Sequence, residues 1–537
     1  MRHLLITIIC LSCFGISAQT SVSFLHLGDA TFQNNLLNPS LIPKGKTFIG
    51  LPVISGVHFN VNTRTSYNET FTSEGGTTLV DIDKILTNLQ NQNFAGVQAN
   101  INLLHLGFKL KNGALFSFTA NERIEADVLY SKQLVDFTWN GNEQFTNQDI
   151  DVSKAGARGT HFREFGLGYA TPVNERLTVG LRGKFLIGFA DVSTPNNFKS
   201  TLNTNGEAFQ LDANWENFAL RRSGLDIYEG EEGSLGSHLI MNQNLGTALD
   251  VGATYHLNRY YTITGSILDV GFIGWKEDIH NETLNDTTFT YDGVQLDDLG
   301  SVRETIEDSL LDKFEPRENF DAYTSWLPTR AYGSWIYHYS QNTDFYVSGG
   351  ARYIQRELKM LYGVGVTHRF GNILTASLSG TKLPQQFFNL GAAFAVDGGP
   401  VQLYMAADQV INFSVPDAKA FDFRFGINVV LNRNEDSGGS GGLSRRPQKP
   451  KAKGLDTNVF LGKQVKTKKR EGIYSIIKKQ KDDRPTLNKP GGTKKVEKVA
   501  TGSNPYFPKD YKKLRRKERK RKRGTNKKRR KRTLRGN

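Results

Sequence analysis

The densest group of side chains able to bind a ligand in this sequence is a basic run near its end. Between Lys512 and Arg532, 16 of 21 residues are lysine or arginine. Such a run attracts polyanions, because the charges add up to a strong local field around phosphate or carboxylate groups. The predicted polyanion-binding residues are Lys512, Lys513, Arg515, Arg516, Lys517, Arg519, Lys520, Arg521, Lys522, Arg523, Lys527, Lys528, Arg529, Arg530, Lys531 and Arg532.

Patterns that would indicate catalysis or a bound metal are weak. The ten histidines run from His3 to His368 without metal-ligand spacing, and the sequence has no His-Glu-x-x-His and no phosphate-binding glycine loop. One Gly-x-Ser-x-Gly match, residues 438–442, lies in a Gly/Ser-rich stretch, so we interpret it as a spacer. The Asp/Asn-rich loop 281–298 lacks the spacing of a calcium loop. The sequence therefore predicts no catalytic, metal or cofactor-binding residues and no cofactor; a barrel lipase is the remaining enzymatic alternative.

The charge of the chain is divided between two parts. From Ser437 onward there are 36 lysines and arginines and 7 acidic residues, a net charge near +29, whereas the preceding residues sum to about −14. Residues 434–457 are rich in glycine, serine and proline and predict a flexible linker. Residues 458–537 are too charged to bury a core, so we expect a disordered, strongly basic tail.

The first residues have the pattern of an export signal. Arg2 precedes a short apolar stretch, residues 4–16, and the small residues Ser17 and Ala18. This pattern predicts a signal peptide over residues 1–18, which is too short to span a bilayer as a helix. Both cysteines lie within it, so the mature chain has no disulfide. Export also separates the tail from chromosomal DNA, and we therefore expect no nucleic-acid partner.

Between residues 19 and 433 the chain repeatedly alternates apolar and polar residues. In residues 177–189 the odd positions are mostly apolar, and in residues 421–431 all of them are. A period of two is typical of strands with one apolar and one polar face. Long strands, tight turns and aromatic residues near strand ends favour an outer-membrane barrel over a secreted β-sandwich. No apolar stretch after residue 18 is long enough for a transmembrane helix.

We predict an all-β fold, a transmembrane antiparallel β-barrel of about 14 strands over residues 19–433, with short rim helices and a disordered basic C-terminal tail. Fifteen strand candidates can be marked, of which one is expected to be a loop hairpin arm, since even strand numbers predominate in bacterial barrels. With an even number, both chain ends lie on the periplasmic side. Residues 79–89 and 301–314 have helical periodicity and indicate rim helices; a helix that plugs the lumen is the alternative.

The same alternation predicts which charged side chains point into the barrel. Both signs occur among them, which favours a plugged or narrow barrel with internal ion pairs over an open, ion-selective pore. The predicted lumen-facing charges are Glu164, Arg176, Arg182, Lys184, Asp250, Asp408, Asp422 and Arg424.

Two short motifs carry a resemblance to known proteins. Asn38-Pro39-Ser40 precedes the first predicted strand, and residues 320–330 read FDAYTSWLPTR before a Tyr/Trp-rich strand. Residues 20–432 thereby resemble a family of Bacteroidota outer-membrane barrels labelled as a domain of unknown function. They are also similar to fatty-acid-transporter-like barrels and to the PorV and PorP/SprF barrels associated with type IX secretion. The fatty-acid transporters have a hydrophobic N-terminal plug, whereas residues 20–37 are short and mixed here, which counts against lipid transport.

These features together predict a non-enzymatic outer-membrane barrel, a scaffold or accessory subunit of an envelope or secretion assembly. Its partners would be outer-membrane lipid and, through the periplasmic tail, peptidoglycan or an acidic periplasmic protein. The alternative is an outer-membrane transporter or channel for a small or lipophilic solute.

Overall fold

The computed structural model describes residues 22–207, 210–225, 242–284, 287–291, 317–354, 357–382, 388–410 and 415–432. Several sequence predictions lie outside these residues: the signal peptide 1–18, the helix at 301–314, the spacer 438–442, the linker 434–457 and the basic tail 458–537 with all its predicted polyanion-binding residues.

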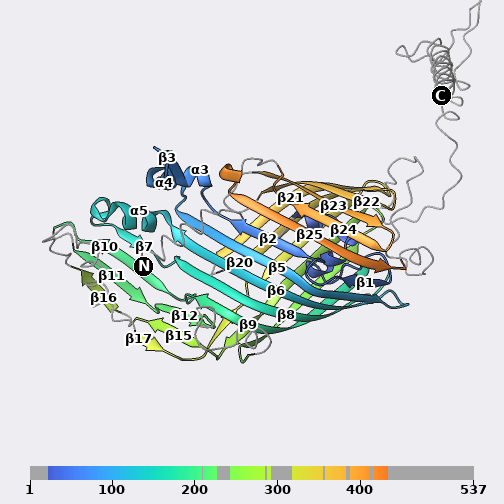
Figure 1. Cartoon of the computed structure of the whole chain (residues 1–537), viewed down its shortest axis with the longest axis horizontal. Coiled ribbons are helices and arrows are strands. Elements are labelled where there is room, and N and C mark those ends of the chain that lie inside the picture. The colour runs from blue at the N-terminus through green and yellow to red at the C-terminus, as the bar shows by residue number, and fades with distance from the viewer. Residues whose placement is uncertain are drawn as a thin grey trace, which may run out of the picture. The chain divides into compact units, whose positions relative to one another are not determined.

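The described residues form a closed antiparallel barrel of 14 strands, which confirms the predicted fold (Figure 1). The first strand has two parts, β1 (Thr47–Gly50) and β2 (Val57–Asn62), and both pair with β5 on one side and β25 on the other, which closes the barrel. The other strands are β5 (Gln92–Lys109), β6 (Leu115–Ser131), β8 (Gly156–Pro172), β9 (Leu177–Ser193), β13 (Leu245–His256), β14 (Tyr261–Trp275), β19 (Arg330–His338), β20 (Thr343–Ile354), β21 (Glu357–Phe370), β22 (Leu374–Lys382), β23 (Asn389–Gly398), β24 (Val401–Ala407) and β25 (Ala420–Leu431).

Strand β9 shows how the alternating sequence builds the wall. Leu181 and Phe185 are 51% and 40% exposed on the outer face, whereas Arg182 and Lys184 are buried inside. An apolar exposed face and closure without a free edge are what a strand wall in hydrocarbon requires. On the outer face, Tyr261 packs against Trp335 and Tyr337 close to the turns at 257–260 and 339–342, where an interfacial aromatic girdle is expected.

The two ends of the barrel differ in their connections. One end has short turns, such as 110–114, 173–176, 371–373 and 399–400, and Thr47 pairs there with both Leu431 and Phe108. The other end carries the longer connections and their secondary structure. These are α3 (Tyr67–Thr70), β3 (Phe71–Glu74), β4 (Thr77–Val80), α4 (Ile82–Asn88), α5 (Lys132–Asn140), η3 (Glu143–Phe145), β12 (Ala219–Ser223), β15 (Ile279–Thr283), β17 (Arg317–Asn319), β18 (Tyr323–Trp326) and η4 (Val415–Asp417), with a four-stranded sheet of β7 (Asp149–Asp151), β10 (Lys199–Thr204), β11 (Leu211–Glu216) and β16 (Thr287–Tyr291).

Two sequence alternatives are decided at this long-loop end. The candidate strand at 207–219 is β11, which belongs to the separate four-stranded sheet and is therefore the expected hairpin arm. Helix α4, from the segment 79–89, is a rim helix: its apolar residues Ile82, Ile85 and Leu86 pack with Tyr130 and Val135. Among the described residues, no helix is long and apolar enough to cross a membrane.

The described residues before β1 lie inside the barrel, where Figure 1 shows them as the darkest blue ribbon. It contains α2 (Val22–Leu25), η1 (Gly28–Ala30) and η2 (Phe32–Leu36). Phe24, Leu27 and Phe32 are fully buried, and so are polar residues such as Asn34. We call residues 22–41 the plug. The sequence analysis took this short, mixed segment as a difference from the hydrophobic N-terminal plug of the fatty-acid transporters; in the structure the segment nevertheless lies in the lumen and fills it.

Candidate functional site in the barrel lumen

The start of the plug is fixed to the wall beside β24. The backbone N–H groups of Val22 and Ser23 donate to the Asp408 carboxylate at 2.6 and 2.9 Å. Across the lumen, His26 stacks on Tyr346 of β20 with a ring-centroid distance of 4.6 Å, and its Nε2 lies 2.9 Å from Ser348 Oγ. The first turn of the plug is thus held by a charged group on one side and an aromatic contact on another.

The middle of the plug packs against β5 and β25. The Phe32 ring stacks on His105 at a centroid distance of 3.7 Å and on Phe48 at 4.7 Å. Asn428 donates through Nδ2 to Gln33 Oε1 at 2.7 Å. Burial of a large aromatic ring together with paired amides gives this part of the plug one defined position.

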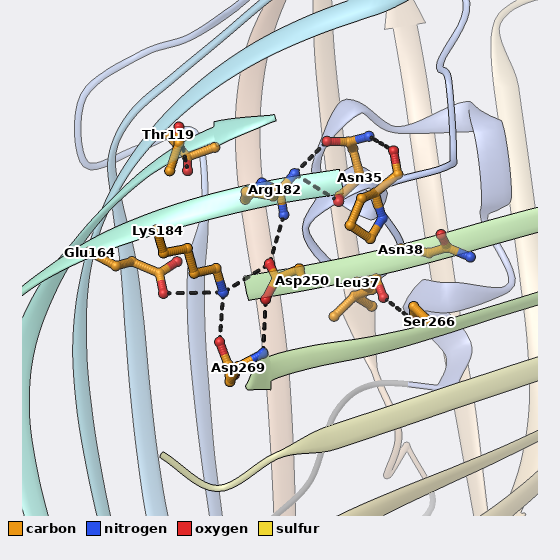
Figure 2. A network of polar contacts seen from close by, with 12 residues as sticks. Asn35, Leu37, Asn38, Thr119, Glu164, Arg182, Lys184, Asp250, Ser266 and Asp269 are labelled. Carbon is orange, nitrogen blue, oxygen red and sulfur yellow. Dashed lines mark hydrogen bonds and ion pairs between the residues drawn. The ribbon is translucent and has the colours of Figure 1, made fainter. Parts of the chain in front are cut away.

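The end of the plug is bound to β9 and β14 (Figure 2). Arg182 Nη2 donates to the carbonyl oxygen of Asn35 at 2.9 Å, and Ser266 Oγ donates to the carbonyl oxygen of Leu37 at 2.6 Å. The backbone of the plug approaches Gly180 so closely that a Cβ at that position would clash with the main chain at Pro39. The wall and the plug are therefore complementary in shape as well as in polarity.

Beneath the plug, Asp269 is the centre of a buried ion network (Figure 2). Its carboxylate accepts from Lys184 Nζ at 2.6 Å, from Arg123 Nη1 and Nη2 at 2.9 and 3.1 Å, and from Arg330 Nε at 2.8 Å. Asp269 is 0% exposed. Its N–H donates to Asp250 Oδ1 at 2.8 Å. One carboxylate therefore joins cations from β6, β9 and β19, three strands that are not consecutive around the wall.

Two further groups of buried polar contacts lie on other sides of the lumen. Arg352 contacts Asp127 at 2.8 Å and Glu125 at 2.9 Å. Asp422 lies 2.8 Å from His58 Nε2 and accepts from Asn60 Nδ2 at 2.7 Å. Buried charges are tolerable only when they are paired and hydrogen-bonded, and these groups meet that condition.

A local irregularity of β14 turns Asp269 inward. The pairing of β13 with β14 shifts register between Leu249 and Val251, and Asp269 has a φ of +61°. Before this bulge the exposed residues of β14 are odd-numbered, such as Ile267, and after it they are even-numbered, such as Val270. An extra residue in one strand reverses its facing pattern. Without the bulge, Asp269 would face lipid.

The structure places seven of the eight predicted lumen charges among the buried residues: Glu164, Arg182, Lys184, Asp250, Asp408, Asp422 and Arg424. Arg176 is the exception and corrects the sequence prediction. It is exposed in the turn between β8 and β9, because β9 begins only at Leu177. The sequence analysis missed Arg123 and Arg352, although Arg123 alternates with apolar residues along β6 and could have been found by the same rule.

The wall is interrupted beside the network, between β1 and β2. Val53 has a φ of +66° in the intervening segment 51–56. Three backbone hydrogen bonds still cross the interruption: from Val53 N–H to Asn102 O and from Ile427 N–H to Ile54 O, both at 2.9 Å, and from Asn102 N–H to Gly56 O at 2.7 Å. Next to it, a small cavity of about 40 Å³ lies in the lumen, and Gly56 and Val57 line it.

The cavity has room for only a few water molecules by the usual measure of about 10–15 Å³ for one. Its charged lining comes from the network: Glu164, Arg182, Lys184, Arg330 and Arg424. Across the part of the chain that the structure covers, no group of three or more His, Cys, Asp or Glu side chains could hold a metal ion.

Comparison with known proteins identifies the family of the chain. A family of unknown function (DUF5723) matches residues 39–408. The chain belongs to this family. The DUF5723 match covers the barrel from the end of the plug to the residue after β24. No curated protein matches the chain.

Several solved structures are similar to this DUF5723 protein. A FadL homologue from Pseudomonas aeruginosa has 11% identity over 77% of this chain and 97% of its own, with a TM-score of 0.36. The toluene transporter TodX from P. putida has 9% identity over 78% and 94%, with a TM-score of 0.31. The translocator domain of the autotransporter NalP from Neisseria meningitidis has 10% identity over 77% and 100%, with a TM-score of 0.27.

Likenesses this distant concern the barrel fold alone. The closed wall and its apolar outer face are those of a transmembrane antiparallel β-barrel. The resemblance to Bacteroidota barrels and to the PorV and PorP/SprF barrels of type IX secretion stays a prediction.

Proposed function

We propose that this protein is a non-enzymatic, plugged outer-membrane barrel that anchors its basic tail beneath the membrane, as a scaffold or accessory subunit of an envelope or secretion assembly. The observation that carries this proposal is the filled lumen. The plug is bonded to strands on several sides, from β24 through β20 to β9 and β14, and an ion network occupies the space below it. A barrel built in this way is suited to hold a position in the membrane.

The side on which the tail emerges follows from the two ends of the barrel. In bacterial barrels the short turns are periplasmic and the long loops extracellular. Strand β25 ends at Leu431 on the short-turn side, so the tail would begin in the periplasm. A coil of about 100 residues has a root-mean-square span of ~50–60 Å, long enough to meet the cell wall or a periplasmic protein.

The ligand of the tail would be a polyanion, either the free carboxylates of cell-wall peptides or an acidic periplasmic protein. The 36 lysines and arginines after Ser437 supply the charge. Attraction of this kind weakens as salt shortens the Debye length from about 30 Å at 0.01 M to about 8 Å at 0.15 M.

Co-sedimentation with purified peptidoglycan sacculi tests this proposal. The full chain in detergent should pellet with sacculi at low salt and be released as salt rises. A variant in which the 16 cations between Lys512 and Arg532 are replaced by glutamine should pellet less, and a chain ending at Arg433 should stay in the supernatant. Equal pelleting of the full and shortened chains would refute a role for the tail. If none pelleted, the cell wall would be excluded as its ligand.

A second candidate function, transport of a small or lipophilic solute, is favoured by the interruption of the wall at 51–56. This segment adjoins the cavity through Gly56, so a path between lumen and membrane would be shortest there. Swelling of proteoliposomes in a series of small solutes, with uptake of a fluorescent lipophilic probe in parallel, tests it. Rates equal to those of protein-free liposomes for all of them would exclude transport by the plugged barrel.

A further inference from the structure

The cavity beside the plug has a strongly one-sided lining. Four cationic side chains line it, Arg182, Lys184, Arg330 and Arg424, together with a single carboxylate, Glu164. The carboxylates that pair with these cations, among them Asp250 and Asp269, are absent from the lining. The network as a whole has both signs, but the cavity is faced mainly by the positive one.

The one carboxylate in the lining is already bonded through both of its oxygens. Glu164 Oε1 accepts from Asn121 Nδ2 at 2.6 Å, and Oε2 accepts from Arg123 Nη1 at 2.9 Å and lies 3.5 Å from Lys184 Nζ. A cation entering the cavity would therefore meet four like charges and a carboxylate with its oxygens occupied. The charges that face the cavity therefore disfavour a cation as its ligand.

One donor of a residue that lines the cavity has no acceptor within the described part of the chain. Arg182 is 1% exposed; its Nη atoms contact Asp250 and Asn35, but its Nε–H has no hydrogen-bond partner among the described residues. A buried charged group with an unmade hydrogen bond is costly, and an acceptor of opposite charge removes that cost.

We propose that this cavity binds a small anion of a few heavy atoms at most, a halide or a free carboxylate group, which accepts from Arg182 Nε and is held in the field of Lys184, Arg330 and Arg424. The size follows from the volume of about 40 Å³, and the sign follows from the lining. The site depends neither on the tail nor on whether the barrel transports a solute.

Bromide is a suitable probe, because its anomalous scattering locates it directly. Crystals of the full chain soaked in sodium bromide should show an anomalous peak in the cavity beside Arg182. In solution, bromide should raise the thermal unfolding midpoint of the detergent-solubilised protein in a saturable manner, at constant ionic strength and sodium concentration, since a ligand bound to the folded state stabilises it. Sodium acetate should compete if the site also accepts a carboxylate; without competition, the ligand is a halide.

Two variants test the named residues against a matched control. Arg424→Gln removes one charge of the lining, and Arg182→Lys keeps the charge but removes the unpartnered Nε–H together with the Nη contacts to Asp250 and Asn35. Each should weaken the bromide affinity about tenfold or more, the usual effect of losing one charge-assisted hydrogen bond or close charge. Arg176→Gln removes a charge from an exposed turn and should leave the affinity unchanged.

Three results would overturn the proposal: no anomalous peak in the cavity, a peak at crystal concentrations without saturable stabilisation in solution, or equal affinities in all variants. If Arg424→Gln failed to fold, the comparison of Arg182→Lys with Arg176→Gln would decide alone.

Discussion

Replacing Asp269 by asparagine tests whether the lumen is a sealed ion network. The exchange keeps the size of the side chain, and asparagine tolerates the positive φ of this position, so the bulge in β14 should be retained. What changes is the charge that faces Arg123, Lys184 and Arg330. The experiment therefore isolates the electrostatic role of one carboxylate.

The expected loss of stability is large because Asp269 is fully buried and forms ion pairs with three cations. Removing one member of a buried ion pair typically costs about 3–5 kcal/mol, since the remaining charge is left uncompensated. We expect the free energy of unfolding to fall by about this amount, measured by guanidinium titration in detergent with tryptophan fluorescence. Asp83→Asn, at an exposed position of α4, should change it by about 0.5 kcal/mol or less.

A second exchange separates stranded charge from damaged packing. Arg330 pairs with Asp269, so adding Arg330→Met to Asp269→Asn removes one of the uncompensated cations and should recover part of the lost free energy. If Asp269→Asn cost no more than Asp83→Asn, the network charges would be screened by water, and the description of a sealed lumen would be wrong.

Three further outcomes follow from the wall and the rim. Gly180→Ala places a methyl group against the plug; it should displace the plug and so produce ion conductance in planar bilayers. At Gly183 an added Cβ meets no atom, so Gly183→Ala should leave the barrel as closed as the unmodified protein. Leu378→Arg should lower the free energy of unfolding by about 2–4 kcal/mol and Ile373→Arg by about 0–1 kcal/mol. The two residues are equally exposed, but Ile373 lies at the turn, near the membrane surface. Equal losses would contradict the position that we assign to the barrel in the bilayer. At the rim, the Lys84 N–H donates to the Asp81 carboxylate and thereby lowers the pKa of Asp81. The stability that the ionised Asp81 side chain adds to α4 is therefore present above the ordinary pKa of aspartate and is lost as the pH falls through the lowered pKa. Amide-exchange protection of residues 82–88, corrected for intrinsic rates, should fall over this pH range, and in Asp81→Asn it should be independent of pH there.

The wall of the barrel could be predicted from the sequence because its information is local. Each strand needs an apolar outer face and a polar inner face, so a period of two marks strand and orientation together, as in β9 and β25. The buried positions of Arg182, Lys184 and Asp422 follow from parity alone. The basic composition of the tail is likewise a property of the sequence and needs no tertiary contact.

The contents of the lumen were decided by tertiary structure. Asp269 has the parity of a lipid-facing residue until a bulge reverses β14, and the bulge depends on the pairing of β14 with β13. The plug has no period of its own; polar groups such as the Asn35 and Leu37 carbonyls are hydrogen-bonded, and its rings are covered, only because β5, β9, β14, β20, β24 and β25 surround it. Alternation within a strand fixes which face a side chain takes, but the partner that it meets across a closed barrel comes from another part of the chain.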